Sequence, residues 1–266
     1  MNKAEKAGRE LREMEKLAAR DSFLHRLSPL SKLVMTIVCI VVTVSFRKYD
    51  ITGLFPMVLV VLAGYQAAEL PVSTCFRKLR IVMPLVCAVG LLNPFLDKEI
   101  LMRLGRIPVR GGVISMLTLA MKGVFSLMAS FLLVATTSID SLCAGLRRIR
   151  FPAMLTSLLL LTFRYVGLLM EEVAAMTDAY HLRAPGQKGI HISAWGSFLG
   201  QLLLRSMDRA QALYESMRLR GFDGEFHYAE GRPYNRFSWL IAVLAAALMI
   251  LMRFVNLPAL LAGLWM

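Results

Sequence analysis

The sequence lacks the motifs that mark most enzymes. It has no G-x-x-x-x-G-K-[ST] phosphate-binding loop, because Gly186-Gln187-Lys188-Gly189 does not have the required spacing. It also has no HExxH metal motif, no GxSxG nucleophile motif and no pair of carboxylates inside an apolar run. These absences argue against an enzyme. Any ATP hydrolysis connected with this chain is therefore expected to occur in a partner protein.

Metal-ligating side chains are few and scattered. The cysteines form no CxxC pair, and no histidine has a ligand-like neighbour three or four positions away. The four cysteines are Cys39, Cys75, Cys87 and Cys143, and the four histidines are His25, His181, His191 and His227. We expect reduced cysteines in the core, histidines at the surface or in helix caps, no metal site and no cofactor. The 17 methionines fall at helical spacing in apolar runs and are interpreted as packing residues.

Acidic side chains are scarce as well. The chain has 18 Asp and Glu residues against 31 Lys and Arg residues, a formal net charge of +13. No basic patch with interleaved aromatic residues supports nucleic-acid binding. The sequence is 57% hydrophobic with a mean hydropathy of +0.58, which is typical of an integral membrane protein with Lys and Arg on its cytoplasmic side. We therefore predict a multi-pass cell-membrane protein that contacts the lipid bilayer and no nucleic acid.

Five apolar runs are candidate membrane spans, since a span needs about 20 apolar residues. They are Leu33–Phe46, Ile51–Ala68, Ile81–Leu96, Val113–Ser138 and Phe237–Phe254. The first run is short and can extend back to Pro29, a residue that suits the first turn of a helix. The tight link Arg47–Asp50 predicts an antiparallel pair from the first two runs. The N-terminal 20 or so residues mix basic and acidic side chains and are expected to form an amphipathic cytoplasmic helix.

The orientation of the chain in the membrane and the roles of two cations inside apolar runs each have more than one interpretation. A cytoplasmic N-terminus places the Arg77-Lys78 and Arg147-Arg148 clusters inside, but it places Arg47-Lys48 outside. Lys122 lies within the fourth apolar run, where a lysine is either a functional group or a side chain that reaches an interface. Arg164 and its neighbour Tyr165 form either a membrane-interface anchor or a hinge between the membrane body and the following helix, and we favour the structural anchor.

The stretch after the fourth run predicts two long helices. The apolar segment Leu155–Met170 could span a membrane, but Arg164 in its middle would be costly in lipid. We expect one helix from Pro152 to Arg183, lying against or just below the membrane face. A second, amphipathic helix is expected from Ser193 to Arg220. Its apolar stripe consists of Leu199, Leu203, Ser206, Ala210, Leu213 and Met217.

Each of these helices is expected to end on an arginine. The two ends read His181-Leu182-Arg183-Ala184-Pro185-Gly186 and Met217-Arg218-Leu219-Arg220-Gly221-Phe222-Asp223-Gly224. Such an arginine can serve its own helix, because the C-terminus carries a partial negative charge. It can also project as a planar cation toward a carboxylate of another protein. Because the pattern occurs twice in one amphipathic region, we favour docking to a soluble partner.

Five stretches, spread over nearly the whole chain, resemble one protein family. They are Leu27–Leu33, Gly90–Phe95, Leu146–Pro152, Phe163–Tyr165 and Ala210–Gly224. The family is the transmembrane T component of energy-coupling factor (ECF) transporters, specifically the cobalt-type CbiQ proteins. The last stretch, which includes the second arginine end, is the most similar to the cobalt-type subgroup.

The resemblance implies a role for six residues. The family carries two Ala-Arg-Gly signatures at the ends of two cytoplasmic coupling helices. They match Leu182-Arg183-Ala184 and Leu219-Arg220-Gly221 here; the arginine is kept in both, Leu replaces Ala in both, and Ala replaces Gly in the first. By this resemblance the helices dock on two cytoplasmic ATPase subunits. They pass the movement of these subunits to a membrane S component that captures the substrate.

The expected fold is an all-α polytopic membrane protein with about five transmembrane helices and a cytoplasmic coupling domain of long amphipathic helices. The expected domains are an N-terminal segment 1–32, transmembrane helices 33–138, a coupling domain 139–236 and a C-terminal transmembrane helix 237–266. The expected function is a non-catalytic energy-coupling scaffold for cobalt uptake. Alternatives are a T component for nickel or a vitamin, and a conventional ABC permease subunit with its own translocation path.

Overall fold

The computed structural model describes most of the chain. The described residues are 3–70, 75, 80, 83–84, 88, 90–91, 100–104, 107–187, 189–224 and 236–254. Most of the third predicted span, Ile81–Leu96, lies outside them. The chain divides into two compact units. One comprises residues 1–17 and 138–231, and the other comprises residues 18–137 and 232–266. Each unit is considered by itself below.

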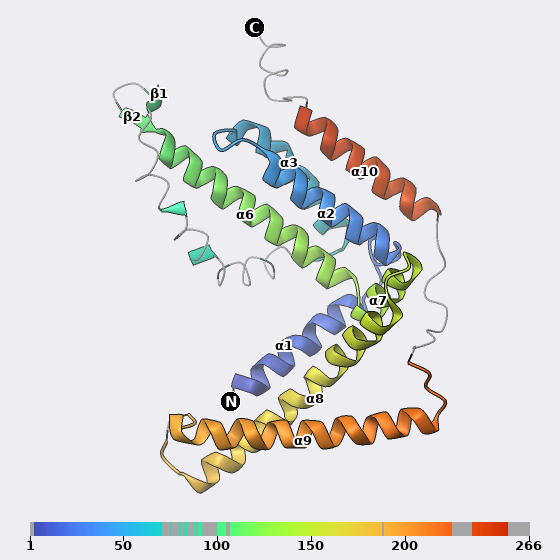
Figure 1. The fold of residues 1–266 in the computed structure, drawn as a ribbon. Coiled ribbons are helices and arrows are strands. Elements are labelled where there is room, and N and C mark those ends of the chain that lie inside the picture. Colours follow the sequence, from blue (N-terminus) through green and yellow to red (C-terminus); the bar gives the residue numbers. More distant parts are fainter. Residues whose placement is uncertain are drawn as a thin grey trace. The chain divides into compact units, whose positions relative to one another are not determined.

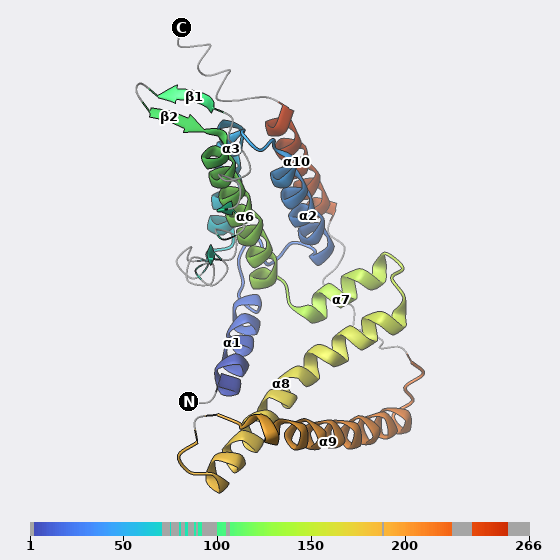
Figure 2. The ribbon, with the colours of Figure 1, turned by 60° about the vertical axis from the view of Figure 1, so that its left-hand side comes forward.

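The second unit is a bundle of apolar helices. Its elements are α2 (Pro29–Ser45), α3 (Ile51–Ala67), β1 (Ile100–Leu104), β2 (Ile107–Arg110), α6 (Gly111–Thr136) and α10 (Arg236–Phe254). Helices α2 and α3 each pack against both α6 and α10. The two short strands form an antiparallel hairpin that leads directly into α6 (Figure 2). Apart from this hairpin, the described regular structure is helical, which confirms the predicted all-α fold.

Hydrophobicity explains why these segments form membrane helices. Helices α6 and α10 are long and apolar enough to cross a membrane, and α2 and α3 are shorter apolar helices. The helices expose large apolar side chains on the outer surface of the unit, such as Val41 and Leu59, and these face where lipid would lie. Helix α2 begins at Pro29, as predicted. The Leu24 N–H donates to the Ala67 carbonyl (3.3 Å), so the end of α3 lies beside the segment that leads into α2, although α2 and α3 make their main contacts with α6 and α10.

Two lysines join α2 and α6, because a lysine of each helix donates hydrogen bonds to carbonyls at the C-terminus of the other helix. The last four carbonyls of a helix lack partners within the helix and carry a partial negative charge. The Lys32 ammonium, in the first turns of α2, donates to the carbonyl of Thr136 at the end of α6 (2.7 Å). Lys122, in the middle of α6, donates to the carbonyls of Val44 (3.1 Å) and Phe46 at the end of α2. Each helix thus stabilises the C-terminus of the other.

Helix α10 adds a second cation at the C-terminus of α2. Arg253 donates to the Ser45 carbonyl (3.0 Å), and its guanidinium lies 4.7 Å from the centre of the Phe46 ring. The end of α2 is therefore held by side chains from α6 and α10. Lys122, which the sequence left open between a functional group and an interface-seeking side chain, has this capping role in the structure.

The cysteines and histidines mostly follow expectation. Cys39, Cys75 and Cys143 are free and buried, as predicted, and Cys87 lies outside the described residues. His25 is not at the surface: it is 2% exposed, and its ring contacts the Ser22 hydroxyl (2.6 Å) and the Ala135 carbonyl (3.3 Å). It therefore acts as a buried capping residue near the end of α6.

The first unit consists of amphipathic helices. They are α1 (Lys3–Ala18), α7 (Ile139–Arg148), α8 (Ala153–Arg183) and α9 (Ile192–Leu219). The observed bounds of α8 and α9 confirm both long helices within one residue. Helix α7 was not predicted, although Ser138 caps it by accepting the Ser141 N–H. Helix α7 packs against α8, and α1 contacts α8 through Arg12 and Glu171 (3.2 Å). By length and composition alone, α8 could also cross a membrane.

The reciprocal caps lead to a stability prediction. We expect Lys32→Met to destabilise the bundle by about 1–3 kcal/mol, because the variant keeps the apolar stem but leaves the buried Thr136 carbonyl without its donor. Unfolding of the purified protein in detergent measures the effect. Arg47→Met, an exposed position beside the other end of α2, serves as the control and should change stability by less than about 0.5 kcal/mol. Equal effects of the two changes would contradict a capping role for Lys32.

Candidate functional site

The C-terminus of α9 is closed by its own backbone. Gly221 has φ +84°, a left-handed conformation that glycine adopts without steric cost. The Gly221 N–H donates to the Arg218 carbonyl (3.0 Å), and the Phe222 N–H donates to the Met217 carbonyl (3.0 Å). This pair of bonds is the Schellman arrangement, in which glycine follows the cap residue. The Arg220 side chain is therefore not needed to terminate the helix.

The C-terminus of α8 is closed differently. Arg183 is its last residue, and the Ala184 N–H donates to the Tyr180 carbonyl (3.0 Å). The Tyr180 hydroxyl donates to Gln187 Oε1 (2.9 Å) and accepts the His191 N–H (3.3 Å). Tyr180 thus organises the connection to α9, at whose start the His191 ring accepts the Ser193 N–H.

A leucine is exposed beside each arginine. Leu182 is 84% exposed and Leu219 is 90% exposed, and Arg183 and Arg220 are exposed as well. A fully exposed leucine adjacent to a cation at a helix end offers both apolar area and charge to a partner. Leu182, Arg183, Ala184, Leu219, Arg220 and Gly221 thus all lie at helix ends. Whether they bind an ATPase stays a prediction.

The structure does not bring the two motifs together. The Arg183 end is joined to the start of α9 by residues 184–191, whereas Arg220 follows the last residue of α9. Helix α9 has 28 residues, which corresponds to roughly 42 Å. Figure 1 shows the α8–α9 connection at one end of α9, and the chain leaves α9 at its other end. The two arginine ends therefore form two separate sites.

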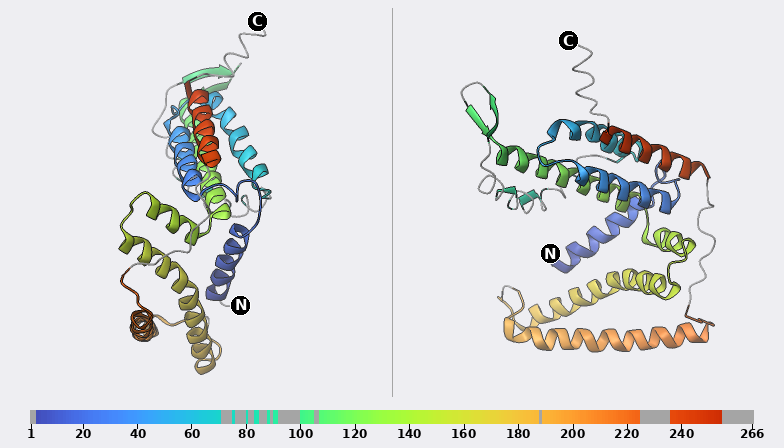
Figure 3. Two further views of the ribbon diagram at one scale, coloured as in Figure 1. Left: turned by 90° about the vertical axis from the view of Figure 1, so that its right-hand side faces the viewer. Right: turned by 45° about the horizontal axis from the view of Figure 1, so that its top comes forward.

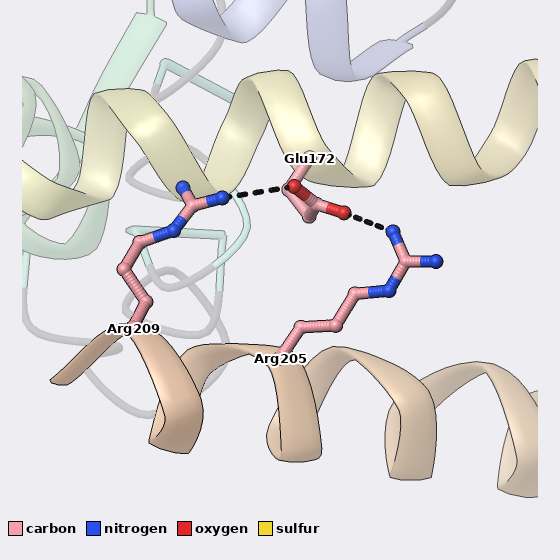
Figure 4. A network of polar contacts seen from close by, with 3 residues as sticks. All are labelled: Glu172, Arg205 and Arg209. Atoms are coloured by element: carbon pink, nitrogen blue, oxygen red, sulfur yellow. Dashed lines mark hydrogen bonds and ion pairs between the residues drawn. The ribbon is translucent and has the colours of Figure 1, made fainter. Parts of the chain in front are cut away.

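One carboxylate links the two long helices. Glu172 of α8 pairs with Arg205 through Oε1 and with Arg209 through Oε2 (3.2 Å), as Figure 4 shows. The hydrogen bond from Arg205 lowers the pKa of the Glu172 carboxyl, and so does its pairing with Arg209. The axes of α8 and α9 are far from parallel, since the left view of Figure 3 shows α9 end-on while α8 runs across the view. Glu172 thus holds two helices that cross.

The predicted stripe of α9 is only partly covered: Ser206, Leu213 and Met217 are half-buried, and the other three members are exposed. Leu199 and Leu203 are 52% and 61% exposed, and Met207, on the same side of the helix, is 62% exposed. The buried apolar contact is made instead by Phe198, which is 8% exposed. An exposed apolar row along an amphipathic helix is typical of a surface that another protein covers.

Sequence reasoning missed the residues that connect the helices. The sequence alone assigned no role to Arg205, Arg209 or Glu172. The signal was present: two arginines four positions apart share one helix face and can reach one acid. Which acid they reach depends on the crossing of the helices, which the sequence alone does not determine.

Together these features define a class of protein: a multi-pass membrane protein with a separate unit of two long crossing helices that end in exposed arginines. The chain matches the cobalt transport protein family (CbiQ) over residues 20–228 and belongs to this family. It is accordingly the transmembrane component of an ECF-type transporter, located in the cell membrane.

Relatives from several bacteria are similar to the chain. The cobalt transport protein CbiQ of Rhodobacter capsulatus is 38% identical over 104 residues, which are 38% of this chain and 42% of that protein. The ECF transporter transmembrane protein EcfT of Bacillus selenitireducens is 28% identical over 235 residues, 82% of this chain and 85% of that protein. The nickel permease LarQ of Lactiplantibacillus plantarum is 30% identical over 97 residues, 36% of each chain.

The left-handed backbone conformation of Gly221 contributes to the stability of the last turn of α9, and this contribution can be measured. We expect Gly221→Ala to destabilise the last turn of α9 by about 1–2 kcal/mol, because an alanine side chain is strained in the left-handed conformation. Gly200→Ala is the matched control. Both glycines have open space where an alanine Cβ would lie, but Gly200 is inside α9, where alanine should stabilise by about 0.5–1 kcal/mol. Amide hydrogen exchange along α9 measures both effects, and equal signs would contradict this account of the cap.

Proposed function

We propose that α8 and α9 are coupling helices that dock on two cytoplasmic ATPase subunits through their arginine ends. The observation that carries the proposal is the pair of exposed Leu–Arg ends, one at the C-terminus of α8 and one at the C-terminus of α9. Two separate sites, at the ends of two different helices, suit two partner subunits better than one. The names of the EcfT relatives, which describe components of energy-coupling transporters, support the same assignment.

The chemistry of each site favours a groove with a carboxylate next to an apolar pocket. The guanidinium of Arg183 or Arg220 can form two parallel hydrogen bonds with a carboxylate. The neighbouring leucine can bury its exposed side chain beside that pair, which would contribute about 1.5–3 kcal/mol if it were fully buried. Movement of the ATPases would then displace the helix ends.

The remaining surfaces suit a scaffold. We assign residues 139–236 to a cytoplasmic coupling domain, residues 33–138 and 237–266 to the membrane, and residues 1–32 to an N-terminal segment. The exposed apolar row of α9, including Leu199, Leu203 and Met207, offers a surface for a membrane S component that holds the substrate. Helix motion driven by the ATPases would be transmitted through this row and would release the substrate inside the cell.

Cobalt is the cargo that the comparisons favour. The chain matches the CbiQ family over most of its length, and the family is described as a cobalt transport family. The partial similarity to the nickel permease LarQ supports nickel as the second candidate. An uptake assay with both metals, in cells that carry the complete transporter, distinguishes these cargoes.

Charge reversal at the helix ends tests the docking proposal. Arg183→Glu and Arg220→Glu should each weaken retention of the ATPases, by about 2–5 kcal/mol of binding free energy where the arginine pairs with a buried carboxylate. The double variant should abolish transport. Copurification of the ATPases and cargo uptake measure these effects. We expect Arg220→Glu to be the more severe change because its motif matches the family signature better.

A nearby arginine provides the control. Arg218 is the next-to-last residue of α9, and its guanidinium lies 5.9 Å from the centre of the Tyr214 ring, so Arg218→Glu is the control. It introduces the same charge but should cost less binding. Normal transport by the Arg183→Glu, Arg220→Glu double variant with both ATPases retained would contradict the docking proposal.

We also infer that the chain by itself is not catalytic. The purified protein should hydrolyse no ATP and should bind cobalt with no micromolar affinity, because its sequence has no phosphate-binding loop and its described residues contain no cluster of three metal-ligating side chains. Isothermal titration calorimetry and a phosphate-release assay measure these properties. A micromolar cobalt site in the isolated chain would show that cargo binding is not confined to a partner.

A further inference from the structure

Glu172 occupies an unusual position between α8 and α9. Its side chain is 18% exposed, whereas the paired arginines Arg205 and Arg209 are 55% and 41% exposed. Its two oxygens are used separately, one for each arginine (Figure 4). Because Arg205 and Arg209 are four positions apart, they lie one turn apart on the same face of α9. The carboxylate of Glu172 therefore has one arginine on each side of it along the axis of α9.

The distances along the chain to the two helix ends are similar. Arg183 follows Glu172 by 11 residues, and Arg220 follows Arg209 by 11 residues and Arg205 by 15 residues. At about 1.5 Å per residue, the first arginine end lies roughly 16 Å from the crossing along α8, and the second lies roughly 16–22 Å from it along α9. The two ends also lie on opposite sides of the crossing along α9, since α9 starts at the connection that follows Arg183. Two arms of similar length therefore meet at Glu172.

Apolar packing provides little restraint against sliding at this crossing. Within α9, all of whose residues the structure describes, only Phe198 is buried, and it lies two turns before Arg205. A shift of α9 along its axis by one turn would take one arginine away from the carboxylate. The two ion pairs therefore oppose sliding of α9 in either direction. Rotation about the carboxylate keeps both pairs, because charge attraction depends on distance more than on the angle between the helices.

We propose that Glu172 is the positioning residue of the coupling unit, a pivot that prevents α8 and α9 from sliding while they rotate against each other. This proposal rests on the proposed function and deepens it. Without the pivot, displacement of one arginine end would be absorbed by slippage between the helices. With the pivot in place, a displacement of one arginine end moves the other arginine end as well.

The neighbouring residue Glu171 supplies a matched control. It belongs to the same turn of α8, but it pairs with Arg12 of α1 (3.2 Å) and its side chain is 59% exposed. Glu171→Gln and Glu172→Gln remove the same charge from adjacent positions. A general effect of charge or helix stability would therefore appear in both variants, whereas a pivot effect would appear only in the second.

The test uses the complete transporter with its ATPases and S component in liposomes. We expect Glu172→Gln to retain the ATPases and their ATP hydrolysis, but to lower the cargo imported per ATP by about fivefold or more, as expected for the loss of a typical coupling free energy. Spin labels at Pro185 and Asp223 report the distance between the arms, whose distribution should broaden. Glu171→Gln should leave both measurements unchanged.

A charge exchange completes the design. Glu172→Arg combined with Arg205→Glu and Arg209→Glu restores the attraction with reversed signs, and it should recover the import ratio and the narrow distance distribution. A normal import ratio in Glu172→Gln would overturn the pivot. Loss of assembly that the exchange does not recover would also overturn it, by assigning Glu172 a folding role. The docking proposal is tested separately by the Arg183→Glu and Arg220→Glu variants, which leave Glu172 intact.

Discussion

The unpaired carbonyls at helix C-termini are the constraint on which both units depend. In the apolar bundle, cations from other helices satisfy these carbonyls: Lys32 serves the end of α6, and Lys122 and Arg253 serve the end of α2. Charge-assisted bonds of this kind are strong where water is scarce, so they tie the helices together. In the other unit, the backbone itself closes α9 at Gly221. That difference leaves the Arg220 side chain available for a partner.

The unit of crossing helices combines exposed surface with a polar connection. Large apolar side chains line the outer face of α9, and one partly buried carboxylate joins α9 to α8. A tightly interdigitated apolar interface would hold the helices at one angle, because packed side chains resist rearrangement. An ion-pair connection permits rotation, and this suits a unit whose proposed task is to pass movement from one partner to another. The same surface would be unfavourable in water unless partners cover it in the assembled transporter.

Much of the helical architecture could be predicted from periodicity and end signals. The observed ends of α8 and α9 lie within one residue of the predicted ones, because Pro152, Pro185 and Gly221 are strong local signals. Helix α7 was missed because only ten residues carry its pattern, and its serine cap was not recognised. The role of Lys122 could not be predicted, since its partners are carbonyls 76 and 78 positions away in the chain.

The sequence by itself determined the membrane class, the long helices and the arginines at their ends, because hydrophobicity, breakers and end motifs act over a few neighbouring residues. The resemblance in Ala210–Gly224 also pointed to the family that the comparison over residues 20–228 confirmed. Only the tertiary structure decided that the two ends form two separate sites, that Leu182 and Leu219 are exposed, and that one carboxylate joins the helices. These features depend on how helices cross, and the crossing arises from contacts between residues distant in the chain.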